Sequence, residues 1–294
     1  MQKKIVNINI LTGVNPVNFE YFFYFIDNIR KLASGKHNIN VSVLTGQGRG
    51  SRNVCSQDQI EKIKTTGVEV VNGNHLFNLG ESLNYLLSID NQKTNDVTLI
   101  SDIDVAIVRK NWDEYALEYL KKYDVIGLPN NEPTHIFEGS KTPDNAHRYH
   151  NNPTVVWMMF NNSNIWKTID FRPDKDNEIK VKEQDAILHG IPNESYLAKD
   201  IGWRIPEFIS NNNLKSYSFI NAGLGRIHQS IIFDGITNNI SWGDGKSGFP
   251  CDEGRIDGLP FIAHQRLSQR WEFMKSPVSK LFYERVTDYI NSHV

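Results

Sequence analysis

The sequence predicts an α/β protein with a mostly parallel sheet flanked by helices on both faces. Three observations lead to this fold class. Apolar residues change repeatedly between the period of a strand and the period of a helix up to Val108. The 294 residues are enough for a large hydrophobic core. Hydrophobic residues make up 39% of the chain, which excludes a wholly disordered protein.

In the first half of the chain, the pattern of apolar residues predicts strands and helices in the order β-α-β-α-β-α-β. Alternation of valine and isoleucine with polar residues predicts the first strand, and an apolar stretch rich in aromatic residues predicts the first helix. Gly46 to Asn53 is a loop by composition. Strands are expected at Lys4–Thr12, Ile39–Leu44, Val68–Val71 and Val97–Val108, and helices at Val17–Leu32, Gln57–Lys64 and Gly80–Ile89. In such sheets ligands bind outside the carboxyl ends of the strands.

The second half has a looser pattern. A polar stretch, Pro129 to Asn152, separates two strand candidates, and a glycine-rich segment runs from Asn221 to Gly258. Strands are expected at Tyr123–Leu128, Thr154–Phe160 and around Phe261–His264, and helices at Lys182–Leu188, Trp203–Ser210 and Val278–Asn291. We therefore expect one continuous domain over residues 1–294.

Charge, hydrophobicity and cysteine content limit the expected binding partners and the expected location of the protein. The 32 Lys and Arg against 34 Asp and Glu give a net charge of −2, which argues against a general polyanion binder. No apolar run approaches the ~18 to 20 residues of a transmembrane helix, so we expect no transmembrane segment. The amino terminus is typical of a strand rather than a signal peptide. Cys55 and Cys251 fit no metal or disulfide spacing, so a cytoplasmic location is expected.

Two carboxylates, Asp102 and Asp104, stand at the end of the apolar strand Val97–Val108. In an extended chain residues i and i+2 point the same way, so both carboxylates would share a face while Ile103 turns to the core. Carboxylates so close repel each other unless a cation lies beside them. A hard divalent ion, Mg²⁺ or Mn²⁺, meets this need. The alternative is a solvated strand end with two chance aspartates.

Gly80 and Asn84, in the helix expected before this strand, strengthen the case that the two aspartates have a function. A glycine-led helix with an asparagine, followed by a strand ending in D-x-D, resembles the GT-A glycosyltransferases. The resemblance covers roughly residues 4 to 165 in element order. It implies a Rossmann-type GT-A catalytic domain with a nucleotide-sugar-binding half, 1–110, and an acceptor-side half, 111–294. It also implies a metal-dependent, inverting hexosyl- or pentosyltransferase that uses Mn²⁺ or Mg²⁺ and a nucleotide diphosphate sugar.

The same resemblance implies specific ligand roles. Asp102 and Asp104 bind the metal with a histidine from the carboxyl-terminal region, for which His264 fits the order and His228 is the rival. The stretch Thr12 to Pro16 departs from the usual short polar turn after the first strand. The residues expected to bind the donor are Thr12, Arg52, Gly80, Asn84 and Asp102.

A carboxylate near the anomeric carbon would deprotonate the acceptor hydroxyl or stabilise positive charge. The resemblance to inverting GT-A enzymes implies Asp185 as the first candidate for this catalytic role and Glu183 as the second. Acidic residues are also favoured in the first turn of a helix by its dipole, without any catalytic role. Asp200, before Gly202 and Trp203, is a third catalytic candidate or else a helix N-cap.

Two other functions are compatible with the D-x-D pattern. Asp102 and Asp104 after an apolar strand also fit a phosphohydrolase of the haloacid dehalogenase type, although Ala106 and the spacing of Asp244 and Asp252 differ from that family. A non-catalytic nucleotide- or carbohydrate-binding module is the other alternative. For a transferase, the acceptor is open among a glycan, a lipid-linked sugar, a protein and a modified DNA base.

Overall fold

A computed structural model gives the structure of the chain. It describes residues 4–16, 18–46, 54–73, 76, 78–90, 96–129, 152–161, 164–174, 178–180, 195–197, 201–222, 230–234, 251–265 and 277–294. The helices are α1 (Phe19–Leu32), α2 (Gln57–Thr65), α3 (Leu79–Asp90), α4 (Trp112–Leu120), the 3-10 helix η4 (Asn164–Thr168), α6 (Ile205–Asn211) and α8 (Pro277–His293).

The strands form three sheets. The large sheet contains β1 (Asn7–Val14), β2 (Asn38–Thr45), β3 (Glu69–Asn72), β4 (Val97–Ser101), β6 (Val125–Pro129), β7 (Pro153–Asn161) and β10 (Ser216–Ser218). The small sheet contains β5 (Val105–Ile107), β11 (Ile220–Asn221), β12 (Cys251–Ile256) and β13 (Leu259–Gln265). A third pair consists of β8 (Glu178–Lys180) and β9 (Ser195–Leu197).

The large sheet is mostly parallel, in the order β10-β6-β7-β4-β1-β2-β3. Strand β7 alone runs antiparallel to both of its neighbours, β4 and β6. The other neighbouring strands of this sheet pair parallel. The expected mixed, mostly parallel sheet is therefore confirmed.

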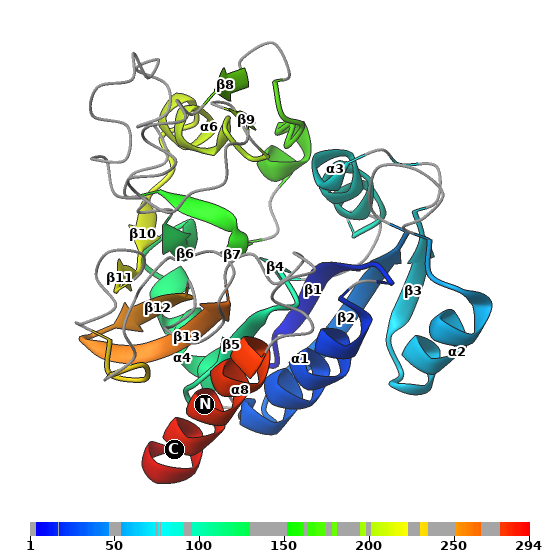
Figure 1. Cartoon of the computed structure of the whole chain (residues 1–294). Coiled ribbons are helices and arrows are strands. Elements are labelled where there is room, and N and C mark those ends of the chain that lie inside the picture. The colour runs from blue at the N-terminus through cyan, green and yellow to red at the C-terminus, as the bar shows by residue number, and fades with distance from the viewer. Residues whose placement is uncertain are drawn as a thin grey trace.

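Helices cover both faces of this sheet (Figure 1). Alternate residues of β1 divide the core: Ile8, Ile10 and Val14 pack in the cluster that contains α1, whereas Leu11 packs in the cluster that contains α3. This division follows from the period-2 alternation of a strand, because each face needs its own apolar cover. Helix α2 joins the α1 side through Ile63.

The strand order reverses beside β1. The chain passes from β1 to β2 and β3 in one direction, with α1 and α2 on one face, and then returns past β1 to place β4 on its other side. The return passes through α3 on the opposite face. The carboxyl ends of β1 and β4 therefore flank a topological switch point, the position where doubly wound sheets bind ligands.

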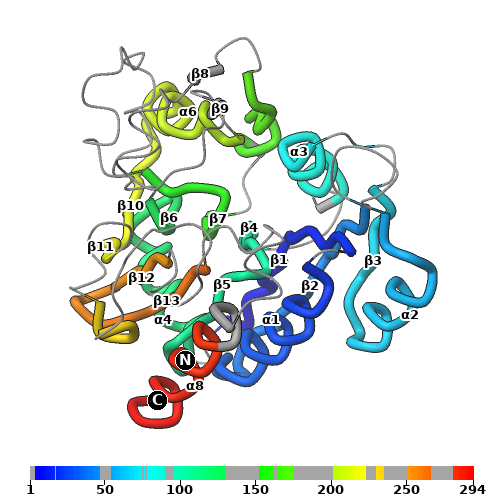
Figure 2. Tube along the Cα trace, in the orientation of Figure 1, coloured from blue at the N-terminus to red at the C-terminus, as the bar shows by residue number. Residues whose placement is uncertain are grey.

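The small sheet has the order β11-β12-β13-β5 and is antiparallel throughout. Figure 2 shows β13, from the carboxyl-terminal part of the chain, beside β5 from its first half. Helix α8 covers this sheet, because Phe282 and Val286 pack with Ala106, Val108 and Ala263. The main core cluster includes residues of both sheets, so the two sheets share one hydrophobic core.

The prediction of one strand over Val97–Val108 is wrong. Strand β4 ends at Ser101, the residues Asp102 to Asp104 form a turn, and β5 begins at Val105 in the other sheet. The prediction failed because both strands are apolar and buried, so apolar content does not mark the break. Ile103 is buried as expected.

The remaining predicted elements have mixed outcomes. The first three strands and helices lie within a few residues of their expected bounds, as do β6, β7, β13, α6 and α8. The sequence pattern missed α4 and β12, and the helix expected at Lys182–Leu188 lies outside the described residues.

The division at residue 110 stays a prediction, and strands from both sides of it pair within both sheets. Cys55 and Cys251 are buried and do not form a disulfide bond with each other. Within the described ranges no helix is long and apolar enough to span a membrane.

Gly80 allows α3 to approach the segment after η4. A Cβ at this position would lie 2.6 Å from the carbonyl oxygen of Phe171 and 2.7 Å from Cα of Arg172. We expect Gly80→Ala to lower the free energy of unfolding by about 1 to 3 kcal/mol, because backbone atoms cannot yield as a side-chain tip can. Urea denaturation measures this change. Ser88→Ala, at an exposed position of the same helix, is the control and should stay within about 0.5 kcal/mol of the unmodified chain.

Candidate metal centre

Three side chains able to bind a metal ion meet beside the end of β4. Asp102 follows β4 directly, Asp104 precedes β5, and His264 lies near the end of β13. One ligand atom from each residue lies within 4.8 Å of the other two. Asp104 and His264 are 8% and 7% exposed, and Asp102 is partly buried. The structure thus brings together the three residues that the sequence predicts as metal ligands.

The backbone of the turn is held by both sheets. The amide of Asp102 donates to the carbonyl of Val156 on β7 at 2.9 Å, and the amide of Gln265 on β13 donates to the carbonyl of Asp104 at 3.1 Å. The register of β5 and β13 places His264 opposite Val105. The backbone of each aspartate is therefore bonded to a different sheet, so the turn is held between the two sheets.

The two nitrogens of His264 face different carboxylates. Nδ1 lies 3.0 Å from Oδ2 of Asp252, and Nε2 lies 3.7 Å from Oδ1 of Asp104. Asp252 is 5% exposed, and its Oδ1 accepts a hydrogen bond from Nδ2 of Asn221 at 3.2 Å. The histidine side chain is therefore held between an outer carboxylate and the pair on the turn.

Burial and mutual repulsion determine the protonation of this cluster. Burial, and next the charge of Asp104, raise the pKa of Asp102 to about 7, although His264 works in the opposite direction. Burial disfavours a charged His264, but Asp104, Asp252 and Asp102 outweigh it and raise the pKa of its imidazole. The cluster therefore holds more negative charge than its surroundings stabilise well, and protons compensate for it near neutral pH.

This donor set fits a divalent cation. Two carboxylates supply oxygen ligands and the imidazole supplies a nitrogen ligand. Mn²⁺ readily binds such a mixed set, whereas Mg²⁺ binds mainly to the oxygen ligands. A cation here would remove the repulsion that raises the pKa of Asp102. Asp102, Asp104 and His264 are thus suited to hold Mn²⁺ or Mg²⁺.

Three of the expected donor-binding residues, Thr12, Gly80 and Asn84, lie in β1 or on α3. Thr12 is buried in β1, two residues before its carboxyl end. The side chain of Asn84 bonds to Asp170 at 2.8 Å and to the amide of Phe171 at 3.0 Å, which ties α3 to the segment after η4. Gly80 makes the close approach described above. The contacts of Asn84 and Gly80 are structural ones, and donor binding by all three residues stays a prediction.

Several predicted site residues lie outside the described residues. They are the catalytic candidates Asp185, Glu183 and Asp200, the donor-binding candidate Arg52 and the rival metal ligand His228. Their roles stay predictions.

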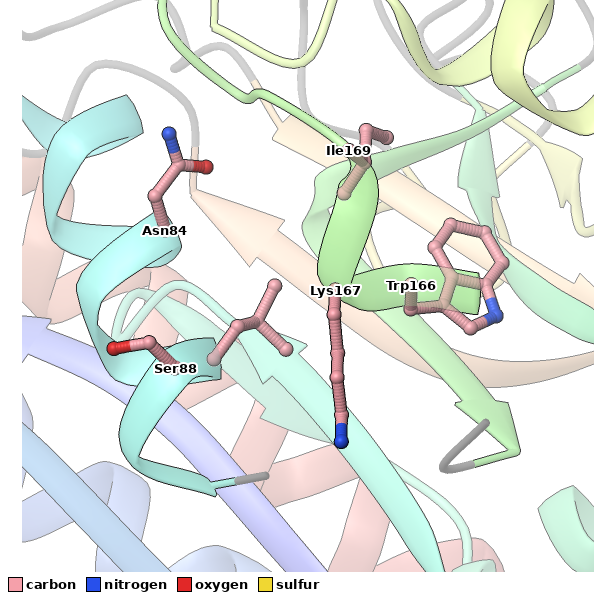
Figure 3. Close-up of a pocket in the computed structure, with 6 residues that line it drawn as sticks. Asn84, Ser88, Trp166, Lys167 and Ile169 are labelled. Carbon is pink, nitrogen blue, oxygen red and sulfur yellow. The ribbon is translucent and has the colours of Figure 1, made fainter. Parts of the chain in front are cut away.

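A pocket of about 260 Å³ lies between α3 and η4. Figure 3 shows Asn84 and Ser88 on α3 across from Trp166, Lys167 and Ile169. None of the three metal-centre residues lines it. Trp166 is itself buried, and its ring stacks on that of Phe160 with the ring centroids 4.5 Å apart. This pocket is therefore separate from the metal centre.

Sequence reasoning missed the contact of Asp252 and Asn221 with the metal centre because no strand was expected in the glycine-rich segment that contains them. The Asp257–Gly258 dipeptide was the available signal. Both residues have positive φ, 54° and 77°, as a two-residue hairpin turn of type I′ requires. Recognising that hairpin would have placed β12 beside the strand that carries His264.

No protein-family model and no curated protein matches the chain. Solved structures resemble it at low identity. A mannosyltransferase from Pyrobaculum calidifontis, in complex with GDP-Man and Mn²⁺, is 10% identical, with a TM-score of 0.46 over 74% of this chain and 55% of its own. TarS of S. aureus (residues 1–349), in complex with UDP, is 16% identical, with a TM-score of 0.38 over 67% of this chain and 59% of its own.

A third such structure is the glucosyl-3-phosphoglycerate synthase of Mycobacterium tuberculosis, in complex with Mn²⁺, UDP and glucosyl-3-phosphoglycerate. It is 15% identical, with a TM-score of 0.37 over 53% of this chain and 57% of its own. This chain therefore spans less than two thirds of each of these three proteins. Because every TM-score is below 0.5, the proposals below depend on the side chains and topology of this chain.

Mn²⁺ affinity should fall as the pH falls. Below pH 7 a proton occupies Asp102, and the raised pKa of His264 adds a second proton that must leave before the imidazole binds a metal. We expect the dissociation constant to rise by at least about tenfold from pH 8 to pH 6. Isothermal titration calorimetry in buffers of different ionisation enthalpy measures both affinity and proton release. An affinity that is constant over this range would contradict the assignment.

Asp102→Asn should stabilise the metal-free protein at pH 8. A raised carboxyl pKa in the folded state means that stability falls as the pH rises from about 4 through 7, so removing the charge restores it. We expect a gain of about 1 to 3 kcal/mol in urea denaturation with EDTA. The same variant should lose the stabilisation that Mn²⁺ gives the unmodified chain. A less stable variant in EDTA would show that the carboxylates do not repel.

Proposed function

We propose that this chain is a metal-dependent glycosyltransferase of GT-A type that transfers a sugar from a nucleotide diphosphate sugar to an acceptor hydroxyl. The observation that carries the proposal is the convergence of Asp102, Asp104 and His264 beside the carboxyl end of β4. This edge is the switch point of the large sheet. A nucleotide at such a point presents its phosphates to the ends of the strands.

The side chains supply what a diphosphate leaving group requires. Asp102, Asp104 and His264 would hold Mn²⁺ or Mg²⁺, which neutralises the charge that develops on the diphosphate when the glycosyl bond breaks. Three protein ligands leave coordination positions for phosphate oxygens. The burial of Asp104 and His264 excludes water from the protein side of the centre, which strengthens every charge interaction there.

The finer features of the reaction are part of the same proposal. We propose inversion at the anomeric carbon, with Asp185 as the base that accepts the proton of the acceptor hydroxyl and Glu183 or Asp200 as the alternatives. Such a carboxylate needs to lie within hydrogen-bond reach of the acceptor oxygen. Thr12, Gly80, Asn84 and Arg52 are proposed to contact the donor. The acceptor is a glycan, a lipid-linked sugar, a protein or a modified DNA base.

A screen of nucleotide sugars tests the function directly. With Mn²⁺ present, we expect one donor class to raise the melting temperature and to be hydrolysed slowly in the absence of acceptor. Asp104→Asn and His264→Ala should each lower this hydrolysis by roughly 10²-fold or more, because the leaving diphosphate loses its counter-charge. Glu61→Gln, an exposed carboxylate on α2, is the control and should keep the full rate.

The competing functions give different results in the same screen. Release of phosphate from phosphomonoesters, without cleavage of any nucleotide sugar, would identify a phosphohydrolase and overturn the proposal. Nucleotide-sugar binding without turnover, and independent of metal, would identify a binding module.

A further inference from the structure

We infer that Asp252 is a positioning residue that, together with Asn221, fixes His264 so that its Nε2 is the metal-binding nitrogen. Three adjacent strands of the small sheet and the turn before its fourth strand each bring one side chain into a row. The row runs from Asn221 on β11 through Asp252 on β12 and His264 on β13 to Asp104, which precedes β5. The inference rests on the metal centre of the proposed function.

The row is buried and its central pair is in register, whereas Asn221 pairs with Gly254 and His264 pairs with Val105, the residue after Asp104. Asp252 and His264 lie directly opposite each other on β12 and β13. Asn221, Asp252 and His264 are 3%, 5% and 7% exposed. Side chains on neighbouring strands that are this well buried lose rotamer freedom on folding, so the ring of His264 is oriented before any ligand arrives.

The hydrogen bonds of the row have a fixed direction. Nδ2 of Asn221 donates to the carbonyl oxygen of Pro129 at 3.1 Å as well as to Oδ1 of Asp252. A carbonyl only accepts, so the amide group of Asn221 has to face Pro129 and Asp252. The carboxylate of Asp252 also only accepts, and therefore Nδ1 of His264 has to donate to it.

This direction determines which nitrogen binds the metal. With its proton on Nδ1, a neutral imidazole presents the lone pair of Nε2, the nitrogen that lies 3.7 Å from Asp104. A carboxylate behind the ring also raises the basicity of the ligating nitrogen. Asp252 thus acts through His264, at the far end of the ring from the metal.

The isosteric variant Asp252→Asn reverses the direction. Because Asn221 still donates toward position 252, the new amide turns its oxygen to Asn221 and its NH₂ to His264. Nδ1 then accepts, and the ring proton moves to Nε2, where it blocks metal binding. We expect the dissociation constant for Mn²⁺ to rise by about 10- to 100-fold.

The experiment combines Mn²⁺ titration with two-bond ¹⁵N–¹H correlation of metal-free, histidine-labelled protein at a pH where the imidazole is neutral. We expect Nδ1–H for His264 in the unmodified chain and Nε2–H in Asp252→Asn. The matched control is Glu253→Gln, which alters the neighbouring buried carboxylate. That carboxylate accepts hydrogen bonds from Ser230, from the amides of Ile231 and Ile232 and from Nε of Arg255, and none of these groups belongs to the row. It should keep the tautomer and bind Mn²⁺ within about twofold of the unmodified chain.

Two results would overturn the inference: Nε2–H in the unmodified chain, or Asp252→Asn that keeps both Nδ1–H and full Mn²⁺ affinity. The first of these needs no variant, so a misfolded substitution does not remove the test. An unmodified chain that shows Nδ1–H and binds no Mn²⁺ would instead refute the metal centre and the proposed function. The tautomer measurement thus distinguishes the two failures.

Discussion

Two carboxylates forced together at a buried edge are the constraint on which the rest of this structure depends. Asp102 and Asp104 lie on one short turn, and neither can move away because its backbone is bonded to a neighbouring strand. The low dielectric of the surroundings strengthens their repulsion. His264 offsets part of this repulsion, because Asp252 favours the protonated form of its imidazole, and a bound cation would complete the compensation. With the charge balanced locally, the chain needs no large excess of basic residues.

The turn also joins the two sheets, so the geometry of the site depends on packing between them. An aromatic triangle performs this packing: Trp157 on β7, Phe219 between β10 and β11, and Phe261 on β13 have ring centroids 5.2 to 5.6 Å apart. All three rings are buried. Close-packed aromatic side chains tolerate little displacement. The separation of the carboxylates from His264 is thus set in the hydrophobic core, and a core substitution here would act on the metal centre.

Apolar periodicity predicted the helices and strands whose pattern of apolar residues matches the surfaces that they bury in the fold. The apolar face of α1 packs on one side of the large sheet, and β1 lies in this one sheet over its whole length, so the sequence pattern shows both elements directly. Asp102 and Asp104 were found because charged groups at the end of an apolar strand contrast with their neighbours, whereas His264 was chosen because the GT-A resemblance implies a histidine ligand from the carboxyl-terminal region. The break at Ile103 gave no such contrast, because apolar strands of two different sheets adjoin it.

The partnership of Asp252 and His264 was beyond simple register rules. A two-residue turn at Asp257–Gly258 alone would pair Asp252 with Ala263. A register shift between Gly254 and Arg255 moves the pairing by one residue, so that Asp252 opposes His264 instead. Such bulges depend on tertiary contacts, here the close packing of Gly254 against Ile262 and Leu128, and not on a local composition signal.

The distance along the chain between the turn and β13 has a consequence for synthesis. Asp102 and Asp104 leave the ribosome long before His264, and β5 has its only partner among the described strands in β13. A nascent chain therefore carries the acidic turn without the strand, the histidine or the outer carboxylate that complete the centre. The complete set of ligands therefore forms only after β12 and β13 have been synthesised and β13 has paired with β5.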